Sequence, residues 1–400
     1  MMEGEQVNPF EIVRNVHWIG VRHPDLKLFD DLLPTRRGTT YNSYLVRGEQ
    51  VAVVDTVKEM FAEEYLRNMA TLVDPKRIAV IVVNHTEPDH SGTLSRLIEL
   101  APQARLFASR AAKLYLKNLL NRSIECTVIE ECPEVSLGGK TLKFISTPFL
   151  HWPDTISTWL PEDRLLFSCD VFASHVCDEG MYDDQVSDLE TDFHIYYDAL
   201  MRPFRDKVLE AVAKVEKLDA VMICPSHGPI LRREPMRYVQ QYKKWATLEM
   251  HAKPYLAVLY SSAHGKTRHM AEALAEGMKR RDVEVELLHI SETPEEKLRA
   301  AMENADGLLF GCSTIVRDLP PPMWRVMALL STVKLRARNA AAFGSYGWSG
   351  EAVAMIEQRL KDMRIPLLPS ELRFKFTPTG EDLERCRKFG EGFAKAAVEG

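Results

Sequence analysis

Residues 80–94, read as Val-Ile-Val-Val-Asn-His-Thr-Glu-Pro-Asp-His-Ser-Gly-Thr-Leu, constrain the fold more than any other stretch of the chain. Four β-branched residues predict a buried strand that ends just before His85, and Ser91 and Gly92 open a helical pattern. Between them stand two imidazoles and two carboxylates, namely His85, Glu87, Asp89 and His90. Neutral His and ionised Asp or Glu are the usual ligands of a divalent or trivalent metal. The spacing therefore predicts a metal site, rather than a solvated loop that merely starts a helix.

Three later apolar stretches, at 141–145, 164–168 and 220–224, also read as strands, and residues 193–217 read as helical. Each of the three strands is followed by a further possible ligand, namely His151, Asp170 and His227. Because sheets collect functional residues at the carboxyl ends of strands, these side chains are expected to meet the first cluster. Three histidines and three carboxylates suit two metals with one bridging carboxylate. Asp170 is the natural bridge because it arrives from a separate strand.

Length and composition bound the remaining possibilities. A chain of 400 residues with 46% hydrophobic content predicts a globular protein of two or three domains. The formal net charge of −6, without a basic run, gives no sign of nucleic-acid binding. No apolar stretch approaches the roughly 18 residues that suggest a membrane span, and the acidic N-terminus does not resemble a secretory signal. Seven scattered cysteines without a C-x-x-C pair indicate reduced thiols and a cytoplasmic protein.

The series of ligands resembles the metallo-β-lactamase superfamily, whose loop is usually H-x-H-x-D-H. Here Glu87 stands where that superfamily commonly has its second His. A carboxylate makes the site harder and more anionic, which moves its preference from zinc toward iron or manganese. Within the superfamily, H-x-E-x-D-H is characteristic of the flavodiiron proteins.

The resemblance to flavodiiron proteins implies a division of the ligands between two irons. His85, Glu87 and His151 would hold one iron, Asp89 and His227 would hold the other, and Asp170 would bridge them. His90 matches a family position that is not always a ligand, and we expect it beside the metals rather than on them. His175, Tyr196 and Tyr197 are candidates for the same surroundings, with ordinary packing as the alternative for each.

The C-terminal part provides an independent indication. Lys253-Pro254 predicts a domain boundary, so that residues 1–253 form a metallo-β-lactamase-like diiron domain and residues 254–400 a flavodoxin-like domain. A short strand at 255–260 leads through a polar loop to a helix, and such a unit offers N–H groups to a phosphate. The nucleotide P-loop motif fails because its first glycine is replaced by Tyr260. The loop instead resembles the flavodoxin phosphate loop, S/T-x-x-x-x-T.

Further alternation of strands and helices predicts a doubly wound α/β domain. Its loops at 261–267, 312–318 and 344–350 would line one crevice, with hydroxyls for a phosphate and amides for a flavin. The predicted cofactor-binding residues are Ser262, Ala263, His264, Gly265, Lys266, Thr267, Ser313, Thr314, Ile315, Ser345, Tyr346, Gly347, Trp348, Ser349 and Gly350. His264, Tyr346 and Trp348 could stack on the isoalloxazine ring. The acidic residue of dinucleotide folds has no counterpart, which favours FMN over NAD or FAD.

The expected fold class is thus an N-terminal αββα sandwich followed by a flavodoxin-like doubly wound parallel sheet. The resemblance implies an oxidoreductase that reduces dioxygen to water, nitric oxide to nitrous oxide, or both. Reduced FMN carries two electrons and a diferrous pair two more, which matches the four that dioxygen needs; two nitric oxide molecules need two. The sequence is compatible with either gas.

Partners are likewise implied by the resemblance. No rubredoxin or flavin reductase module is expected, so electrons would come from a separate donor: rubredoxin, a reduced deazaflavin coenzyme or a flavin reductase. The family's head-to-tail homodimer is expected, with a dimer of dimers as a further assembly.

Two alternatives remain. One is a dinuclear zinc hydrolase fused to a flavodoxin electron carrier, against which Glu87 and the flavin loops argue. The other is an electron carrier on a degenerate scaffold, against which the intact set of six ligands argues.

Overall fold

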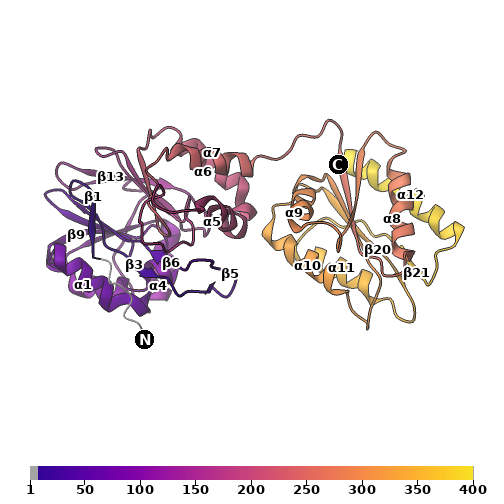
Figure 1. Cartoon of the computed structure of the whole chain (residues 1–400), viewed down its shortest axis with the longest axis horizontal. Helices are drawn as coiled ribbons and strands as arrows, with labels where there is room; N and C mark the ends of the chain where they lie inside the picture. The colour runs from indigo at the N-terminus through magenta and orange to yellow at the C-terminus, as the bar shows by residue number, and fades with distance from the viewer. Residues whose placement is uncertain (1–7, 400) are drawn as a thin grey trace. The chain divides into compact units, whose positions relative to one another are not determined.

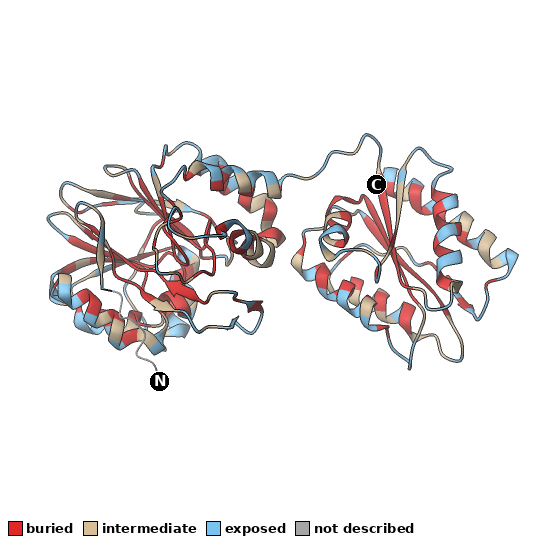
Figure 2. Ribbon diagram, in the orientation of Figure 1, coloured by how far each residue is buried: buried red, intermediate tan, exposed pale blue. Residues whose placement is uncertain are grey.

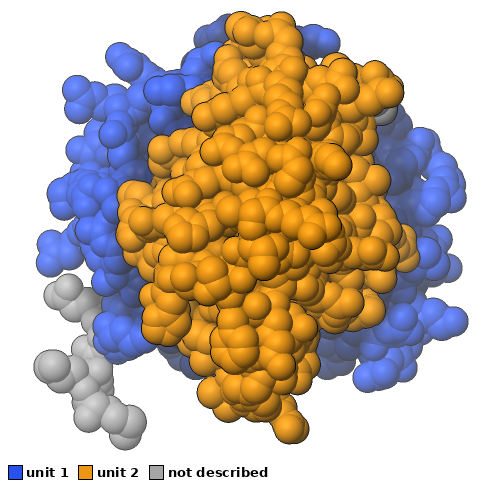
Figure 3. Space-filling view, turned by 90° about the vertical axis from the view of Figure 1, so that its right-hand side faces the viewer, with its two compact units in different colours: residues 1–247 blue, residues 248–400 orange. Residues whose placement is uncertain are grey.

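The computed structural model describes residues 8–399 and divides the chain into two compact units. The first comprises residues 1–247 and the second residues 248–400, coloured separately in Figure 3. The boundary predicted from Lys253-Pro254 lies a few residues further along the chain. Within the part that the structure describes, no helix combines the length and the apolar character that crossing a bilayer requires.

Two sheets form the centre of the first unit (Figure 1). The seven-stranded sheet has the order β1 (Phe10–Val13), β2 (Val16–Trp18), β7 (Tyr44–Arg47), β8 (Val51–Val54), β9 (Ile78–Val82), β10 (Arg105–Ala108) and β11 (Thr127–Val128). The five-stranded sheet has the order β12 (Glu134–Ser136), β13 (Thr141–Ser146), β14 (Ile156–Leu160), β15 (Leu165–Cys169) and β16 (Met222–Pro225). Two small ribbons accompany them, β3 (Val21–His23) with β6 (Thr39–Tyr41) and β4 (Leu28–Phe29) with β5 (Leu33–Pro34).

Helices cover the outer faces of both sheets. They are α1 (Ala62–Leu72), α2 (Pro88–Ser91), α3 (Leu94–Leu100), α4 (Arg110–Leu119), α5 (Leu189–Tyr196), α6 (Arg205–Val215) and α7 (Met236–Ala246). The alternation of strand side chains assigns each to a layer. In β9, Val80 and Val82 face the second sheet, whereas Ile81 packs with the layer that contains α1, α3 and α4. Leu166 and Ile223 of the second sheet pack in the same way with α5, α6 and α7.

The αββα layering confirms the fold predicted for the N-terminal part. β9 is buried on both faces, and burial of each such Val or Ile contributes roughly 1.5–3 kcal/mol. Figure 2 shows the two sheets as buried strands beneath helices with exposed outer faces. The strand β14 was not predicted, although it joins β13 to β15 in antiparallel pairing.

The long helix predicted over 193–217 is interrupted in the structure. After α5, residues Tyr197–Met201 form a π turn, Arg202–Phe204 form a 3-10 turn, and α6 then follows. Pro203 lies in the 3-10 turn, where it lacks the N–H that a continuous α-helix would need. The stretch is thus helical to Val215, as predicted, but its middle is not regular α-helix, and the π turn comes directly after Tyr196.

The second unit is a five-stranded parallel sheet with helices on both faces. Its order is β18 (Glu284–His289), β17 (Tyr255–Tyr260), β19 (Gly307–Gly311), β20 (Asn339–Tyr346) and β21 (Arg373–Lys375). The helices are α8 (Lys266–Met278), α9 (Glu295–Asn304), α10 (Pro321–Leu329), α11 (Glu351–Asp362) and α12 (Gly380–Glu399). Figure 1 shows α8 and α12 on one face and α9, α10 and α11 on the other.

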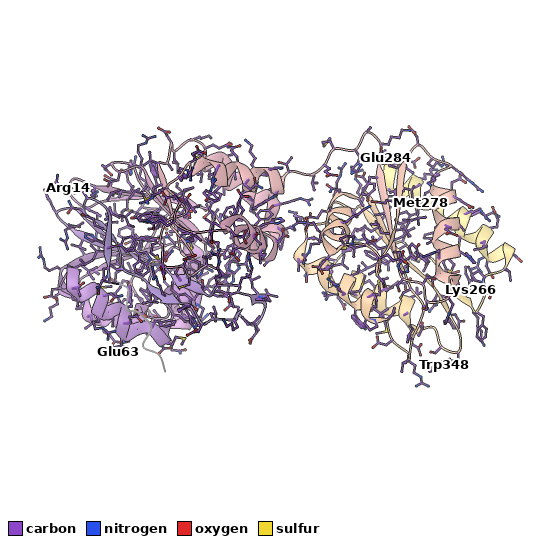
Figure 4. The ribbon with its side chains drawn as sticks, in the orientation of Figure 1. Arg14, Glu63, Lys266, Met278, Glu284 and Trp348 are labelled. Carbon is purple, nitrogen blue, oxygen red and sulfur yellow. The ribbon has the colours of Figure 1, made fainter. Side chains whose placement is uncertain are left out.

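This arrangement confirms the predicted doubly wound sheet. All of its strand pairs are parallel, so the carboxyl ends of β17, β19 and β20 open toward the same edge. Figure 4 shows Lys266 and Trp348 at one end of this unit, with Glu284, at the start of β18, at the opposite end. The three loops that follow those strands can therefore line one crevice.

Candidate metal centre and cofactor crevice

The ligand loop after β9 is fixed by a buried carboxylate. Asp55 accepts the Asn84 backbone N–H at 2.7 Å and the Asn84 side-chain amide at 2.9 Å. Pro88 then begins α2, where its missing N–H costs nothing. These contacts determine the direction in which the following side chains leave the loop.

Four of the predicted ligands meet in one group. Single ligand atoms of His85, Glu87, His151 and Asp170 all lie within 4.8 Å of one another. Glu87 Oε2 lies 3.1 Å from His85 Nε2 and 3.0 Å from His151 Nε2. Asp170 Oδ2 lies 3.8 and 3.9 Å from the same two nitrogens. The residues come from three separate loops.

A second group adjoins the first across Asp170. It contains Asp89, His90 and His227, whose ligand atoms also lie within 4.8 Å of one another. His227 Nε2 lies 3.0 Å from Asp89 Oδ2 and 3.5 Å from Asp170 Oδ1. His90 Nε2 lies 3.2 Å from Asp170 Oδ1. One oxygen of Asp170 thus faces the first group and the other faces the second.

Hydrogen bonds orient the histidine rings toward this common centre. The His85 Nδ1 atom lies 3.2 Å from Asp154 Oδ1, and Asp154 also accepts the N–H and hydroxyl of Thr86. His227 Nδ1 lies 2.7 Å from the carbonyl oxygen of Thr40. Each contact leaves Nε2 free to face the ligand groups, as partners of metal-binding histidines do. Asp154 was not predicted, because nothing in Trp-Pro-Asp distinguishes it from a turn residue.

Other polar side chains surround Asp170. Ser226 and Tyr196 donate their hydroxyls to Asp170 Oδ1, at 2.7 and 3.2 Å. His175, which was expected beside the metals, lies with its ring centroid 5.0 Å from that of His227. Its Nδ1 atom lies 2.9 Å from Thr39 Oγ1. Tyr197 is buried in the α5–α7 layer, against Tyr242.

In the two groups, contacts between carboxylates and imidazoles lower the pKa of the carboxyls and raise the pKa of His85. Burial alone would raise the pKa of Glu87, but hydrogen bonds with His151 and His85 lower it to about 2. Burial also opposes ionisation of Asp89, yet the charges of His90 and His227 lower its pKa to about 2. Burial would lower the pKa of His85, whereas hydrogen bonds with Asp154 and Glu87 raise it to about 10.

The geometry fits two cations. Three buried atoms of the site lack a hydrogen-bond partner of good geometry among the described residues. They are both carboxylate oxygens of Asp89 and the Nε2 of His90. The 3.0 Å contact between His227 Nε2 and Asp89 Oδ2 lacks hydrogen-bond geometry, as expected for two ligand atoms that face one ion. Buried polar atoms that stay unpaired are costly, and metal ions bound there would satisfy them. The donor set of nitrogen and carboxylate oxygen suits iron or manganese.

The second unit contains a cavity of about 350 Å³ at the predicted crevice. Its lining is Ser262, Ala263, His264, Lys266, Thr267, Ser313, Thr314, Ile315, Ser345, Tyr346, Gly347, Phe376 and Thr377. Most predicted cofactor-binding residues are therefore brought together. Gly265 lies within the same loop with a φ of 75°, a conformation that suits glycine. Phe376 and Thr377 follow β21 and were not predicted.

The remaining three predicted residues line a neighbouring groove. Trp348, Ser349 and Gly350 lie there with Tyr346, which belongs to both hollows. Trp348 is exposed, and the Arg317 guanidinium lies 5.4 Å from its ring centroid. The structure therefore does not bring these three residues into the main cavity.

Hydrogen bonds to the backbone and to one another hold the hydroxyls of the crevice in place. Ser262 Oγ accepts the Arg268 N–H at 3.2 Å in the first turn of α8. Thr267 Oγ1 and Ser345 Oγ are hydrogen-bonded at 3.0 Å, which ties the first loop to the third. Hydroxyls and N–H groups at a helix start favour a phosphate, and Lys266 adds a positive charge to the same lining.

Comparisons with known proteins agree with both units. Residues 39–228 match the family described as ODP family beta lactamase, and residues 258–390 match the flavodoxin family. The chain is 36% identical to the flavo-diiron protein FprA2 of Clostridium acetobutylicum, over 96% of this chain and 99% of the relative. It is 33% identical to a nitric oxide reductase of Moorella thermoacetica, over 96% and 98% of the two chains.

A solved structure is similar over the same extent. The rubredoxin oxygen:oxidoreductase from Desulfovibrio gigas superimposes with a TM-score of 0.71 at 26% identity, covering 98% of this chain and 99% of the other. Both the domain matches and the full-length relatives point to one family. The chain belongs to the flavodiiron proteins.

Proposed function

We propose that this protein is an oxidoreductase that reduces dioxygen to water, nitric oxide to nitrous oxide, or both, with two irons and one FMN. The observation that carries the proposal is the position of Asp170, whose two oxygens face two groups of ligand atoms. The relatives from Moorella thermoacetica and Desulfovibrio gigas are named for nitric oxide and for oxygen, which supports both gases as substrates.

The ligands are proposed to divide between the two irons as the two groups divide. His85, Glu87 and His151 would hold the first iron, Asp89 and His227 the second, and Asp170 both. His90 was expected beside the irons, but its Nε2 lies 3.2 Å from an Asp170 oxygen, closer than the Nε2 atoms of the three other histidines, and it is a candidate seventh ligand. The phosphate of FMN would lie against Ser262, Lys266 and Thr267, with its ring system in the rest of the cavity.

When bound, the irons and the flavin would supply the electrons: four with four protons convert dioxygen to two waters, and two with two protons convert two nitric oxides to nitrous oxide and water. The protein positions these groups, and aromatic rings pack beside two of the histidines. The buried Phe29 ring lies 5.4 Å from that of His227, and the Trp152 ring lies 5.0 Å from that of His85. Tyr196 and Ser226 hold the Asp170 carboxylate in one orientation.

A separate donor is proposed to deliver the electrons, and rubredoxin is the first candidate because the Desulfovibrio gigas relative is named for it. A reduced deazaflavin coenzyme and a flavin reductase are the others. The head-to-tail homodimer expected from the family is proposed for this chain as well. The seven cysteines are all free thiols, which supports action in the cytoplasm.

The dinuclear zinc hydrolase is not favoured. Glu87 would contribute a hard oxygen ligand where zinc enzymes of the superfamily commonly use His. Hydrolysis transfers no electrons, so it would not need the flavodoxin unit.

The proposal is tested on the purified, reconstituted protein under anaerobic conditions. We expect about two irons and one FMN per chain, and consumption of dioxygen or nitric oxide when each candidate donor is supplied in turn. Two zincs with esterase activity, or no gas consumption with any donor, would reject it.

A further inference from the structure

An exposed aromatic residue in a left-handed backbone conformation stands at the flavin cavity. Phe376 has a φ of 57° and is 65% exposed, although bulky residues rarely adopt positive φ. It lies in the connection between β21 and α12, where a glycine would adopt the same positive φ without strain. Both the positive φ and the exposure of a large apolar ring are unfavourable in the isolated chain. A bound molecule that covers the ring would account for them.

The position of Phe376 is fixed by the third loop of the crevice. Its N–H donates to the carbonyl oxygen of Tyr346 at 2.7 Å, directly after the β20–β21 pairing. The Phe376 ring also approaches Gly347, where an added Cβ would lie 3.5 Å from the ring. The Lys375 ammonium lies 5.8 Å from the centroid of the ring. The side chain therefore lines the cavity in a defined position.

Three aromatic side chains line this cavity among the described residues: His264, Tyr346 and Phe376. Trp348, which the sequence suggested for stacking, lines the neighbouring groove instead. In this cavity Phe376 is thus present where the sequence had offered Trp348. Ile315, which is 44% exposed, provides a second apolar side chain in the same lining.

We infer that Phe376 is a positioning residue for the flavin, whose isoalloxazine ring covers the exposed phenyl ring and offsets the strained backbone beneath it. The inference rests on the proposed FMN site. It assigns to Phe376 an affinity contribution that comes from the ring system, not from the phosphate. Aromatic pairs gain about 0.5–1.5 kcal/mol beyond the area they bury, which corresponds to about tenfold in affinity when burial is included.

The test uses the full-length, iron-loaded chain from which FMN has been reversibly removed. Dissociation constants for FMN and for riboflavin are measured by quenching of flavin fluorescence, and thermal unfolding is followed in the flavin-free protein. Phe376→Gly removes the ring and releases the strain. We expect it to weaken FMN and riboflavin by the same factor, about tenfold, while it raises the Tm of the flavin-free C-terminal transition by roughly 2 °C.

Two further variants separate the contributions. Phe376→Tyr keeps an aromatic ring and is expected to retain the affinity within about threefold. Arg364→Gly is the matched control, because Arg364 also has a φ of 57° but follows α11 away from the cavity. We expect it to raise the Tm in the same way with no effect on either flavin.

Each outcome bears on the inference. Unchanged flavin affinity in Phe376→Gly would overturn it, as would a fall in Tm, which would show that the ring supports the fold itself. Weaker dimerisation with unchanged flavin affinity would instead assign the ring to a contact between copies of the chain. Failure of the wild-type protein to bind FMN would reject the proposed function, and it is distinguishable because riboflavin and FMN would then both fail in every variant.

Discussion

The Asp170 carboxylate has one oxygen toward each group of ligand atoms, and no other described carboxylate of the site does so. We expect Asp170→Ala to lose both irons and all gas consumption while it keeps one FMN per chain, because the two groups lose the ligand that they share. Metal analysis, flavin absorbance and an oxygen electrode measure these three quantities.

The control for this variant is Asp178→Ala. Asp178 belongs to the same unit, is partly exposed and pairs with Arg37 rather than with the ligands. It should keep its irons. Substantial dioxygen or nitric oxide consumption by Asp170→Ala would contradict the ligand assignment.

Asp154 acts through His85, whose ring it orients. We expect Asp154→Asn to lower iron affinity by about 10–100-fold, as loss of such partners generally does, since the ring loses its anionic acceptor. Competition with a chelator measures the change. Asp163→Asn, which alters a carboxylate paired with Lys140, should leave the affinity unchanged, and equal affinities in all three proteins would show that Asp154 has no orienting role.

The stability of the metal-free protein should depend on pH through His85. Hydrogen bonds raise its pKa from 6.5 to about 10 on folding, so the folded state binds the proton more tightly than the unfolded state. That contribution to stability is complete below pH 6.5 and disappears between pH 6.5 and 10, with a slope of at most about 1.4 kcal/mol per pH unit for one group.

Urea unfolding between pH 6.5 and 9.5 measures this dependence. Iron should abolish it, because a metal-bound imidazole has already released its proton. A metal-free protein whose free energy of unfolding rises over this interval would contradict the assignment.

Single residues differ in how far the sequence could reveal them. His85, Glu87 and Asp89 are visible because they stand together after an apolar run. Asp154 is not visible, since its partner His85 lies 69 positions away and only folding brings the two together. Phe376 was missed for another reason: its unusual feature is a backbone angle, which no residue pattern there indicates.

At the scale of elements, α4 connects the metal centre to the rest of the first unit. Ser109 accepts the Ala112 N–H at 3.1 Å as the N-cap of α4 and donates its hydroxyl to the Asp154 carbonyl oxygen at 2.8 Å. We expect Ser109→Ala to lower the free energy of unfolding by about 1–2 kcal/mol. Urea denaturation of the metal-free protein measures it.

Ser95→Ala is the comparison for this variant. Ser95 lies on α3, and its hydroxyl makes only long, exposed contacts, with Glu99 at 3.5 Å and with the Arg122 guanidinium at 3.3 Å. The free energy of unfolding should therefore change by less than about 0.5 kcal/mol. If both substitutions lowered the free energy of unfolding equally, the Ser109 cap would make no particular contribution to stability.

Helices and strands were predictable where the spacing of apolar residues agrees with polar or turn residues at the ends of the element. β17 and α8 were located closely because an apolar run, a polar loop and a helix follow one another. Over 193–217 the sequence indicated helix but not the π and 3-10 turns within it, because the apolar pattern continues through Pro203. β14 carries Ser157 and Thr158 among its apolar residues, so it lacks the unbroken apolar run by which the neighbouring strands were recognised.

At the scale of the whole molecule, two compact units carry two different cofactor sites. We expect calorimetry of the full-length protein to show two unfolding transitions. FMN at 100 times its dissociation constant should stabilise the C-terminal transition by about 2.7 kcal/mol, and iron should stabilise only the N-terminal one.

Asp170→Ala provides the internal check, because it should remove the response to iron and keep the response to FMN. A single transition that both ligands shift would contradict independent units. The two-unit organisation was predictable from the sequence, because each part has its own alternation of strands and helices around its own site.

The proposed metal ligands are distributed between His85 and His227, with strands of both sheets between them in the sequence. A ribosome that has synthesised half of this chain has therefore not yet supplied the last of them. With this ligand set, loading of both metals must follow synthesis of His227, and a nascent or truncated chain that stops earlier lacks a ligand for the second metal however much iron the cell contains.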